Sequence, residues 1–287
     1  YPMCREFVNS SGKVHKMLNK VRIYSVLLAG GLLLAGFSVQ AQVVGSQHDL
    51  TNTGTGQGGT ANTDQVCVFC HTPHGADTDA PVPLWNKVLG TGDTPPFTRY
   101  SSLATPSFDS AEAPVGSVSL ACLSCHDGTQ AMDVVINGPG SGNYNPNGSE
   151  IDPVAIGVMT GAPVPMLGQD LTNDHPISMQ YGGGGATVAD ANGTFTGTLG
   201  DPDFVAPEKA TINGQPIWWV NSNAGTAARE KTDMLLYTRN DLGVQEPFVE
   251  CGSCHDPHNA ASQGTGSVAF LRTSNAASAV CVACHTK

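Results

Sequence analysis

The sequence has few basic residues, and this scarcity limits its possible partners. Five of the 13 Lys and Arg residues and one of the 24 Asp and Glu residues lie in residues 1–41. Residues 42–287 therefore carry 8 basic and 23 acidic side chains, a formal net charge of −15. Such a surface repels nucleic acid and anionic lipid and attracts cations or basic partners. We expect no nucleic-acid partner.

Long apolar runs are also scarce, and the single one lies near the start of the chain. Residues 23–37 form an apolar run of about fifteen residues, short of the roughly twenty that a membrane-spanning helix needs. Lys20 and Arg22 precede the run, and the small-residue site at 39–41 follows it, a pattern typical of a secretory signal peptide. The pattern predicts that residues 1–41 are the leader region. Its signal peptide begins at Met17 and is cleaved near Ala41. We expect an exported mature chain without a membrane span, located outside the cell or at its outer surface, or alternatively in the periplasm.

Material for an ordinary hydrophobic core is limited as well. The 34 glycines and 19 prolines are many, and four of the 18 aromatic residues lie in residues 1–41, which leaves 14 for the mature chain. Residues 53–63 and 182–185 have loop-like composition. The sequence predicts mostly coil with short helices and a few short strands. One short strand is expected at Ile217–Val220, where we expect the pair Trp218 and Trp219 to pack in a core.

Cysteine, in contrast, is concentrated in four short motifs. Of nine cysteines, Cys4 lies upstream of Met17, and the other eight form four C-x-x-C-H sequences, numbered here as motifs 1 to 4. They are Cys67-Val68-Phe69-Cys70-His71, Cys122-Leu123-Ser124-Cys125-His126, Cys251-Gly252-Ser253-Cys254-His255 and Cys281-Val282-Ala283-Cys284-His285. C-x-x-C-H is the attachment signature of c-type haem.

The spacing within the motif suits this chemistry. Two cysteines three residues apart on one helical turn face the same way, so each can form a thioether to a haem vinyl group, and the following histidine ligates the iron. A thioredoxin-like site shows one C-x-x-C, and a zinc site does not require His after every second Cys. A disulfide framework does not place all eight cysteines at one spacing. The motifs therefore predict four covalently bound haem c groups.

Each haem iron has a second axial position, and the histidine count matches this demand. The mature chain holds eight histidines, and the four outside the motifs, called here the spare histidines, are His48, His74, His175 and His258. Four spare histidines for four positions predict bis-histidine ligation of every haem. Methionine is the competing ligand, but we expect packing roles for Met132, Met159, Met166, Met179 and Met234, because the histidine count already closes.

The local sequence of the spare histidines indicates how they serve the haems. His74 and His258 each follow a motif histidine by three residues, on the same side of a helical turn. Neither can easily reach the opposite face of its own haem, so we expect each to ligate a neighbouring haem. His175 precedes Pro176, which favours an extended backbone that either presents the imidazole or forms a plain surface turn. His48 lies near the predicted mature terminus, where it can fold back or cross to another subunit.

The order of the motifs indicates a loose duplication within a single tetrahaem domain at 42–287. Motif 1 has the extended form C-x-x-C-H-x-P-H and is followed by the plain motif 2 in residues 67–126, and the same order recurs in residues 251–285. The inserted segment, residues 127–250, contains no cysteine. We expect the haem groups themselves to form the core, because each brings a large apolar ring to a chain with little apolar area.

Several phrases resemble a known family, the doubled C-x-x-C-H multihaem cytochromes. They are Cys67 to Gly75, Cys122 to Gly128, Asp174 to Ser178 and Cys251 to His258. With four haem motifs and a short start at Ser46 to Leu50, the chain is similar to the extracellular cytochrome nanowires of metal-reducing bacteria. The resemblance extends through the motifs, and residues 182–250 add little to it. It implies a continuous stack of bis-histidine haems, polymerised subunits, and one axial histidine donated across the subunit boundary, a position that His48 matches.

The expected function is therefore extracellular electron transfer by a head-to-tail polymer, without catalysis. Its partners are expected to be further copies of the chain and redox proteins or extracellular electron acceptors. A monomeric periplasmic tetrahaem shuttle is the first alternative. A multihaem reductase with one open haem is the second, and it requires that one spare histidine does not bind iron.

Overall fold

The structure is a computed structural model that describes residues 43–54, 61–89, 96–103, 109–140, 143–151, 156–160, 165–186, 193–195, 197–223, 228–259 and 270–287. The chain divides into two units, Tyr1–Ala41 and Gln42–Lys287. The predicted leader lies outside the described residues. Among the described residues, no helix has the length and apolar character needed to cross a membrane.

The described residues are mostly coil with few short helices and two antiparallel sheets, as the sequence predicts. The helices are η1 (Val66–Phe69), η2 (Tyr100–Leu103), α2 (Ser117–His126), η3 (Tyr181–Gly183), α3 (Cys251–Cys254), η5 (Ala276–Ser278) and α4 (Ala279–Val282). Each motif begins on one of these helices, and three of the four helices are a single turn. Motif 2 differs because α2 extends over ten residues.

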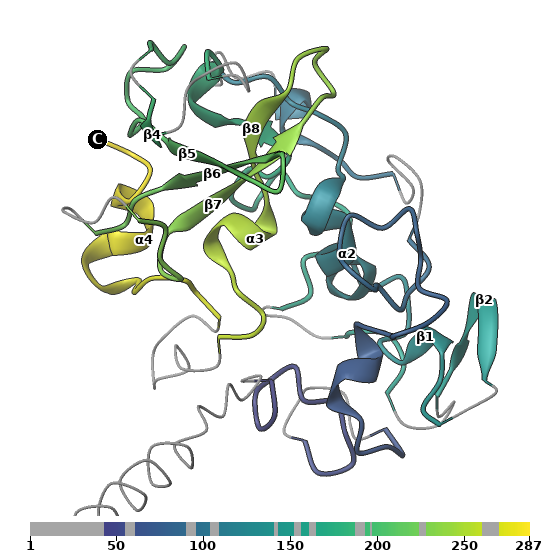
Figure 1. The fold of residues 1–287 in the computed structure, drawn as a ribbon. Coiled ribbons are helices and arrows are strands. Elements are labelled where there is room, and N and C mark those ends of the chain that lie inside the picture. The colour runs from purple at the N-terminus through teal and green to yellow at the C-terminus, as the bar shows by residue number, and fades with distance from the viewer. Residues whose placement is uncertain are drawn as a thin grey trace, which may run out of the picture. The chain divides into compact units, whose positions relative to one another are not determined.

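A six-stranded antiparallel sheet occupies much of the inserted segment (Figure 1). Its spatial order is β3-β8-β7-β6-β5-β4, with β3 at Met179–Gln180, β4 at Gly193–Thr194, β5 at Glu208–Ile212, β6 at Gln215–Val220, β7 at Met234–Arg239 and β8 at Glu246–Val249. A two-stranded sheet pairs β1 (Val134–Asn137) with β2 (Tyr144–Glu150). The predicted strand at Ile217–Val220 is therefore confirmed as the greater part of β6, and the sequence did not reveal the rest of the larger sheet.

The hairpin between β5 and β6 illustrates why this segment forms a sheet. Ile212 pairs with Gln215, so Asn213 and Gly214 form a two-residue turn. Both have positive φ, 50° and 77°, the conformation that such hairpin turns require and that Asn-Gly adopts readily. The hairpin brings Trp218 and Trp219 into the centre of the sheet, where both are buried.

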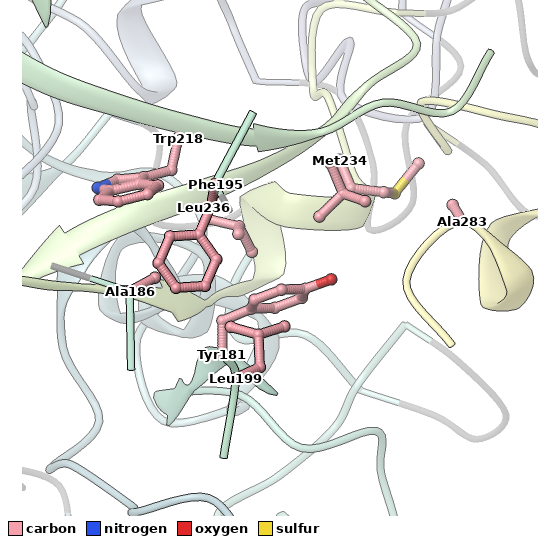
Figure 2. Close-up of a cluster of buried hydrophobic side chains, with 9 residues drawn as sticks. Tyr181, Ala186, Phe195, Leu199, Trp218, Met234, Leu236 and Ala283 are labelled. Atoms are coloured by element: carbon pink, nitrogen blue, oxygen red, sulfur yellow. The ribbon is translucent and has the colours of Figure 1, made fainter. Parts of the chain in front are cut away.

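Three buried apolar clusters adjoin the motifs. The largest lies on the six-stranded sheet and includes Tyr181, Trp218 and Met234 (Figure 2). Cys254 and Cys284 pack against it. A second contains Leu120 and Leu123 of α2, and a third has Cys70 and Cys125 packed against it. All five methionines that compete as ligands lie in or against these clusters, as packing roles predict: Met132, Met159, Met166, Met179 and Met234.

A buried ion pair between Arg239 of β7 and Glu250, together with the hydrogen bonds of Glu250, connects β7, α2 and the start of α3. The Glu250 carboxylate accepts a hydrogen bond from Arg239 at 2.9 Å and others from Ser119 of α2 and from Ser178. Glu250 also caps α3, and the Cys251 N–H donates to Ser119 Oγ at 2.9 Å. Burial raises the pKa of Glu250, whereas the hydrogen bond from Ser119 and the charge of Arg239 lower it. The pair therefore fixes the start of motif 3 against α2.

Replacement of Glu250 by Ala is expected to lower the free energy of unfolding by about 3 kcal/mol, because it leaves Arg239 buried beside fewer acceptors and removes the α3 cap. Urea unfolding followed by circular dichroism at pH 7 measures this change. The matched control is Lys287→Ala, which breaks an exposed pair with Asp203 and is expected to change nothing measurable. Equal stabilities of the two variants would contradict the structural role of Glu250.

Candidate haem-binding sites

The backbone of each motif forms one helical turn that brings both cysteines and the histidine together. In motifs 1, 3 and 4 the histidine N–H donates to the carbonyl of the first cysteine, at 2.8 Å for His71 and 3.0 Å for His255 and His285. In motif 2 the whole C-x-x-C-H sequence lies inside α2. All eight cysteines are free thiols, so every motif can form two thioethers.

Motifs 1, 3 and 4 share a second feature, which we call the closing bridge. Each motif histidine pairs as an isolated antiparallel bridge with one residue of a remote segment: Trp85 for His71, Leu271 for His255 and Phe204 for His285. The bridge has the same two hydrogen bonds each time. In the first bond the carbonyl of the second cysteine accepts from a remote backbone N–H: Asn86 to Cys70, Arg272 to Cys254 and Val205 to Cys284. In the second bond the N–H of the residue after the histidine donates to a remote carbonyl: Thr72 to Leu84, Asp256 to Phe270 and Thr286 to Asp203. All six distances are 2.8 to 2.9 Å.

The closing bridge fixes a histidine that stands outside any long helix. Two backbone hydrogen bonds on either side of the residue hold its Cα in place, so its ring direction depends on only two side-chain torsions. Leu84 and Phe270, which accept one of these bonds in motifs 1 and 3, both have positive φ, 56° and 63°. Such a conformation is uncommon for large side chains, which indicates that the bridge imposes it.

The ring nitrogens of several histidines are oriented by backbone carbonyls. His71 Nδ1 lies 2.8 Å from the Pro83 oxygen, His126 Nδ1 lies 2.7 Å from the Pro165 oxygen, and His175 Nδ1 lies 3.0 Å from the Pro176 oxygen. A carbonyl only accepts, so Nδ1 donates in each contact, and in a neutral ring this leaves the lone pair on Nε2. This is the arrangement by which proteins orient metal-ligating histidines.

The rings of the motif histidines lie opposite rings of spare histidines. The centroids of His71 and His258 are 6.1 Å apart, those of His126 and His48 are 6.1 Å apart, and those of His285 and His175 are 6.4 Å apart. Two imidazoles bound to opposite sides of one metal, with bonds of about 2 Å, have centroids about 6.3 Å apart. Each pair therefore has the separation that a six-coordinate haem iron requires.

The pairing resolves which spare histidine faces which motif. His258 lies three residues beyond motif 3, yet its ring lies 6.1 Å from that of His71 of motif 1, and its ligation of a neighbouring haem stays a prediction. His74 and His255 are the remaining spare and motif histidines. His74 is exposed, and its carbonyl accepts a hydrogen bond from Asn137 Nδ2 at 2.7 Å.

His48 is held within its own chain. Its ring stacks on Phe270 with centroids 4.2 Å apart and an interplanar angle of 8°, and it hydrogen-bonds the Pro257 carbonyl. Asp49, the next residue, is buried and accepts a hydrogen bond from the Gly45 N–H at 2.7 Å. The arm thus folds back onto the segments around motif 3, one of the two positions that the sequence left open.

Burial keeps several of these imidazoles neutral. Desolvation lowers the pKa of His48 to about 4, and the nearby His126 adds to this effect. Burial likewise lowers the pKa values of His126 and His175. A neutral imidazole offers the lone pair that binds a metal, so these rings are in the ligating form at neutral pH.

The pKa values of several motif thiols are shifted by burial and by thiols of other motifs. Burial, reinforced by Cys125, raises the pKa of Cys70 to about 12. A hydrogen bond between Cys122 and Cys251 raises the pKa of the first and lowers that of the second. Burial, reinforced by Cys254, raises the pKa of Cys284 to about 12. Cys70 and Cys125 pack against one apolar cluster and Cys254 and Cys284 against another, whereas Cys67 and Cys281 are exposed.

Several residues that support this arrangement carry no signal in the sequence. Phe270 stacks on His48, Phe204 packs on His285 with centroids 4.5 Å apart, and Trp85 meets the edge of His71 at 6.0 Å. Asn86 is buried and donates from Nδ2 to the Val68 carbonyl at 2.6 Å. Only contact in the fold identifies these residues, because each stands far from its partner along the chain.

The described residues also offer no rival metal site. Nowhere among them do three or more His, Cys, Asp or Glu side chains gather as a metal-ion site needs. A haem iron, in contrast, takes only two protein ligands, which is the number each histidine pair supplies. No family model matches the chain, and no curated protein matches it.

Proposed function

We propose that this protein is an exported tetrahaem c-type cytochrome that transfers electrons and has no catalytic activity of its own. The single observation that carries the proposal is the set of three histidine pairs, each composed of one motif histidine and one spare histidine at 6.1 to 6.4 Å. The motifs come from the sequence, whereas the pairing comes from the fold. The two independent features agree on the same six histidines.

The residues around the pairs suit a covalently attached haem. The eight motif cysteines, free and beside the motif histidines, supply the thioether sulfurs. The eight histidines supply the axial ligands: His71 with His258, His126 with His48, His285 with His175, and His255 with His74. The buried Trp85 Nε1 has no hydrogen-bond acceptor among the described residues, and a haem carboxylate is a fitting acceptor. When bound, haem supplies reversible one-electron chemistry.

The pairing favours electron transfer over the reductase alternative. Imidazoles on both sides of an iron leave no position for a small-molecule substrate, and two imidazole ligands without methionine favour a low potential. Neighbouring thiols in motifs 1 to 4 place successive sites next to one another. Because the terminal cysteines Cys67 and Cys281 are exposed, electrons can enter at motif 1 and leave at motif 4, or the reverse.

The proposal also includes the assembly of the cytochrome into a filament. The resemblance to extracellular cytochrome nanowires is its support. The position of His48 inside its own chain satisfies motif 2 without a second copy, so a monomeric periplasmic shuttle stands beside the filament as the alternative. Both forms use the same four sites, and they differ only in the partner at each exposed end.

Intact-mass spectrometry of the secreted protein is expected to show four haem increments, because four motifs offer eight thiols. Absorption and paramagnetic resonance spectra are expected to show low-spin iron in both oxidation states, since every position has an imidazole. Carbon monoxide binding by the native reduced protein provides the check. Fewer than four haems would contradict the attachment proposal, and one high-spin haem would favour the reductase alternative.

His258→Ala is expected to open the iron of motif 1 and leave that of motif 3 closed. The variant alone should show one high-spin haem of four. Combining it with Cys67→Ala and Cys70→Ala, which remove the motif 1 haem, should leave three haems that are all low-spin. The control carries Cys67→Ala and Cys70→Ala only. A high-spin haem that persists in the triple variant would place His258 on another motif.

His48→Ala distinguishes the monomer from the filament. If the arm serves its own chain, the variant keeps its assembly state and exposes one high-spin iron per chain. If the arm crosses to a neighbour, filaments seen by electron microscopy are lost or weakened together with the appearance of the high-spin iron. Wild-type protein that stays monomeric at high concentration would refute polymerisation and support the shuttle. Phe270→Leu, which removes the stacking partner of His48 but no ligand, is the matched control.

A further inference from the structure

Lys87 is a fully buried lysine next to motif 1. Its side chain is among the largest that are completely inaccessible, although lysine is rarely buried without an ionic partner. Its Nζ donates to three backbone carbonyls, those of Val134 at 2.7 Å and of Ala131 and Met132 at 3.1 Å. An ammonium has three protons, so the cradle matches the charged form donor for acceptor. Among the described residues, no carboxylate lies within ion-pair distance of it.

The backbone places this cation beside the motif 1 attachment site. The preceding residue, Asn86, donates its N–H to the Cys70 carbonyl at 2.9 Å as part of the closing bridge. Met132, whose carbonyl receives the ammonium, belongs to the apolar cluster against which Cys70 packs. Burial raises the pKa of the Cys70 thiol and Cys125 adds to the rise, while the charge of Lys87 opposes it, so the charge and the sulfur interact.

A cation in such a position affects an electron-accepting group in one direction. Reduction of haem iron adds one negative charge, and a fixed positive charge nearby stabilises the reduced state. The effect is large in a buried site because the effective dielectric constant is low and salt does not screen the interaction. Burying an ammonium is costly, and here three backbone carbonyls offset the cost. The rest of motif 1, with two imidazole ligands, would otherwise have a low potential.

We propose that Lys87 raises the reduction potential of the haem carried by Cys67 and Cys70 above the value that its ligands alone would give. This inference rests on the proposed function. The cation makes the four sites unequal, so an electron resides preferentially at the exposed motif 1 end of the chain. Electron transfer along the neighbouring sites is then favoured in one direction, toward motif 1. Identical bis-histidine ligation alone would give no such preference.

The test is a spectroelectrochemical titration of the four-haem protein and of Lys87→Met and Lys87→Gln. Methionine keeps the length and removes the charge, and glutamine also keeps donors for the carbonyls. Both are expected to shift one of the four midpoints to lower potential, with much smaller shifts of the other three. Lys209→Met is the matched control, because Lys209 is also buried but lies over Trp218 on the six-stranded sheet. Its motif 1 midpoint is expected to match that of the wild type.

Each outcome decides the question. Unchanged midpoints, a uniform shift of all four, or a shift to higher potential would overturn the proposal. If neither variant retains four haems while Lys87→Arg does, the cation is required for folding, and the tuning role is refuted. Haem content of the wild type is measured first, so a protein without haem refutes the proposed function before Lys87 is considered. The shift is assigned to motif 1 by repeating the substitution without Cys67 and Cys70, where it should disappear.

Discussion

The separation of two imidazole rings is the constraint on which the rest of this structure depends. A ring pair about 6.3 Å apart can hold a six-coordinate metal between them, and a displacement of either ring by an ångström would remove one bond. Here the two rings of each pair come from remote parts of the chain: His258 lies 187 positions beyond His71 in the sequence, and His48 lies before motif 1 yet faces motif 2. If each pair holds a metal, the fold must fix both members independently, and the closing bridges and the carbonyl contacts to Nδ1 contribute to this.

A coil-rich chain meets this demand with backbone hydrogen bonds, not with long helices. The closing bridge recurs in motifs 1, 3 and 4, and in each case a remote segment passes the histidine in antiparallel orientation. The six-stranded sheet supports the second half of the chain in the same way, since its buried face adjoins Cys254 and Cys284. The buried pair of Arg239 and Glu250 then fixes α3 against α2, and a carboxylate without its cation at this position would be costly. Regular structure is used sparingly, where two motifs must be held together.

The sequence predicted what depends on local spacing. The four motifs, the one-turn helices and the strand at Ile217–Val220 all follow from residues within one turn or one strand of each other. The crossed ligation expected of His258 also comes from local spacing, a three-residue offset from His255, and it stays a prediction. The closing bridges, the Glu250 network and the Phe270 stack could not be predicted, since each joins segments tens or hundreds of residues apart and uses ordinary side chains. The position of the His48 arm stayed open for the same reason: Phe270 and Pro257, which hold it, share no pattern with it.

The closure of His48 within its own chain changes what an assembly would require. If an identical arm from a second copy occupied the same site, one imidazole would replace another, and the number of iron–nitrogen bonds would stay the same. Exchange of identical elements of this kind is a low-cost route to oligomers. Ligation therefore does not decide between monomer and filament. Whether the protein is a monomer or a filament depends instead on contacts between the surfaces of the arm and of the exposed motif 1 and motif 4 ends. Because residues 42–287 carry 23 acidic and 8 basic side chains, those surfaces must bring apolar or basic contacts together against a general repulsion between copies.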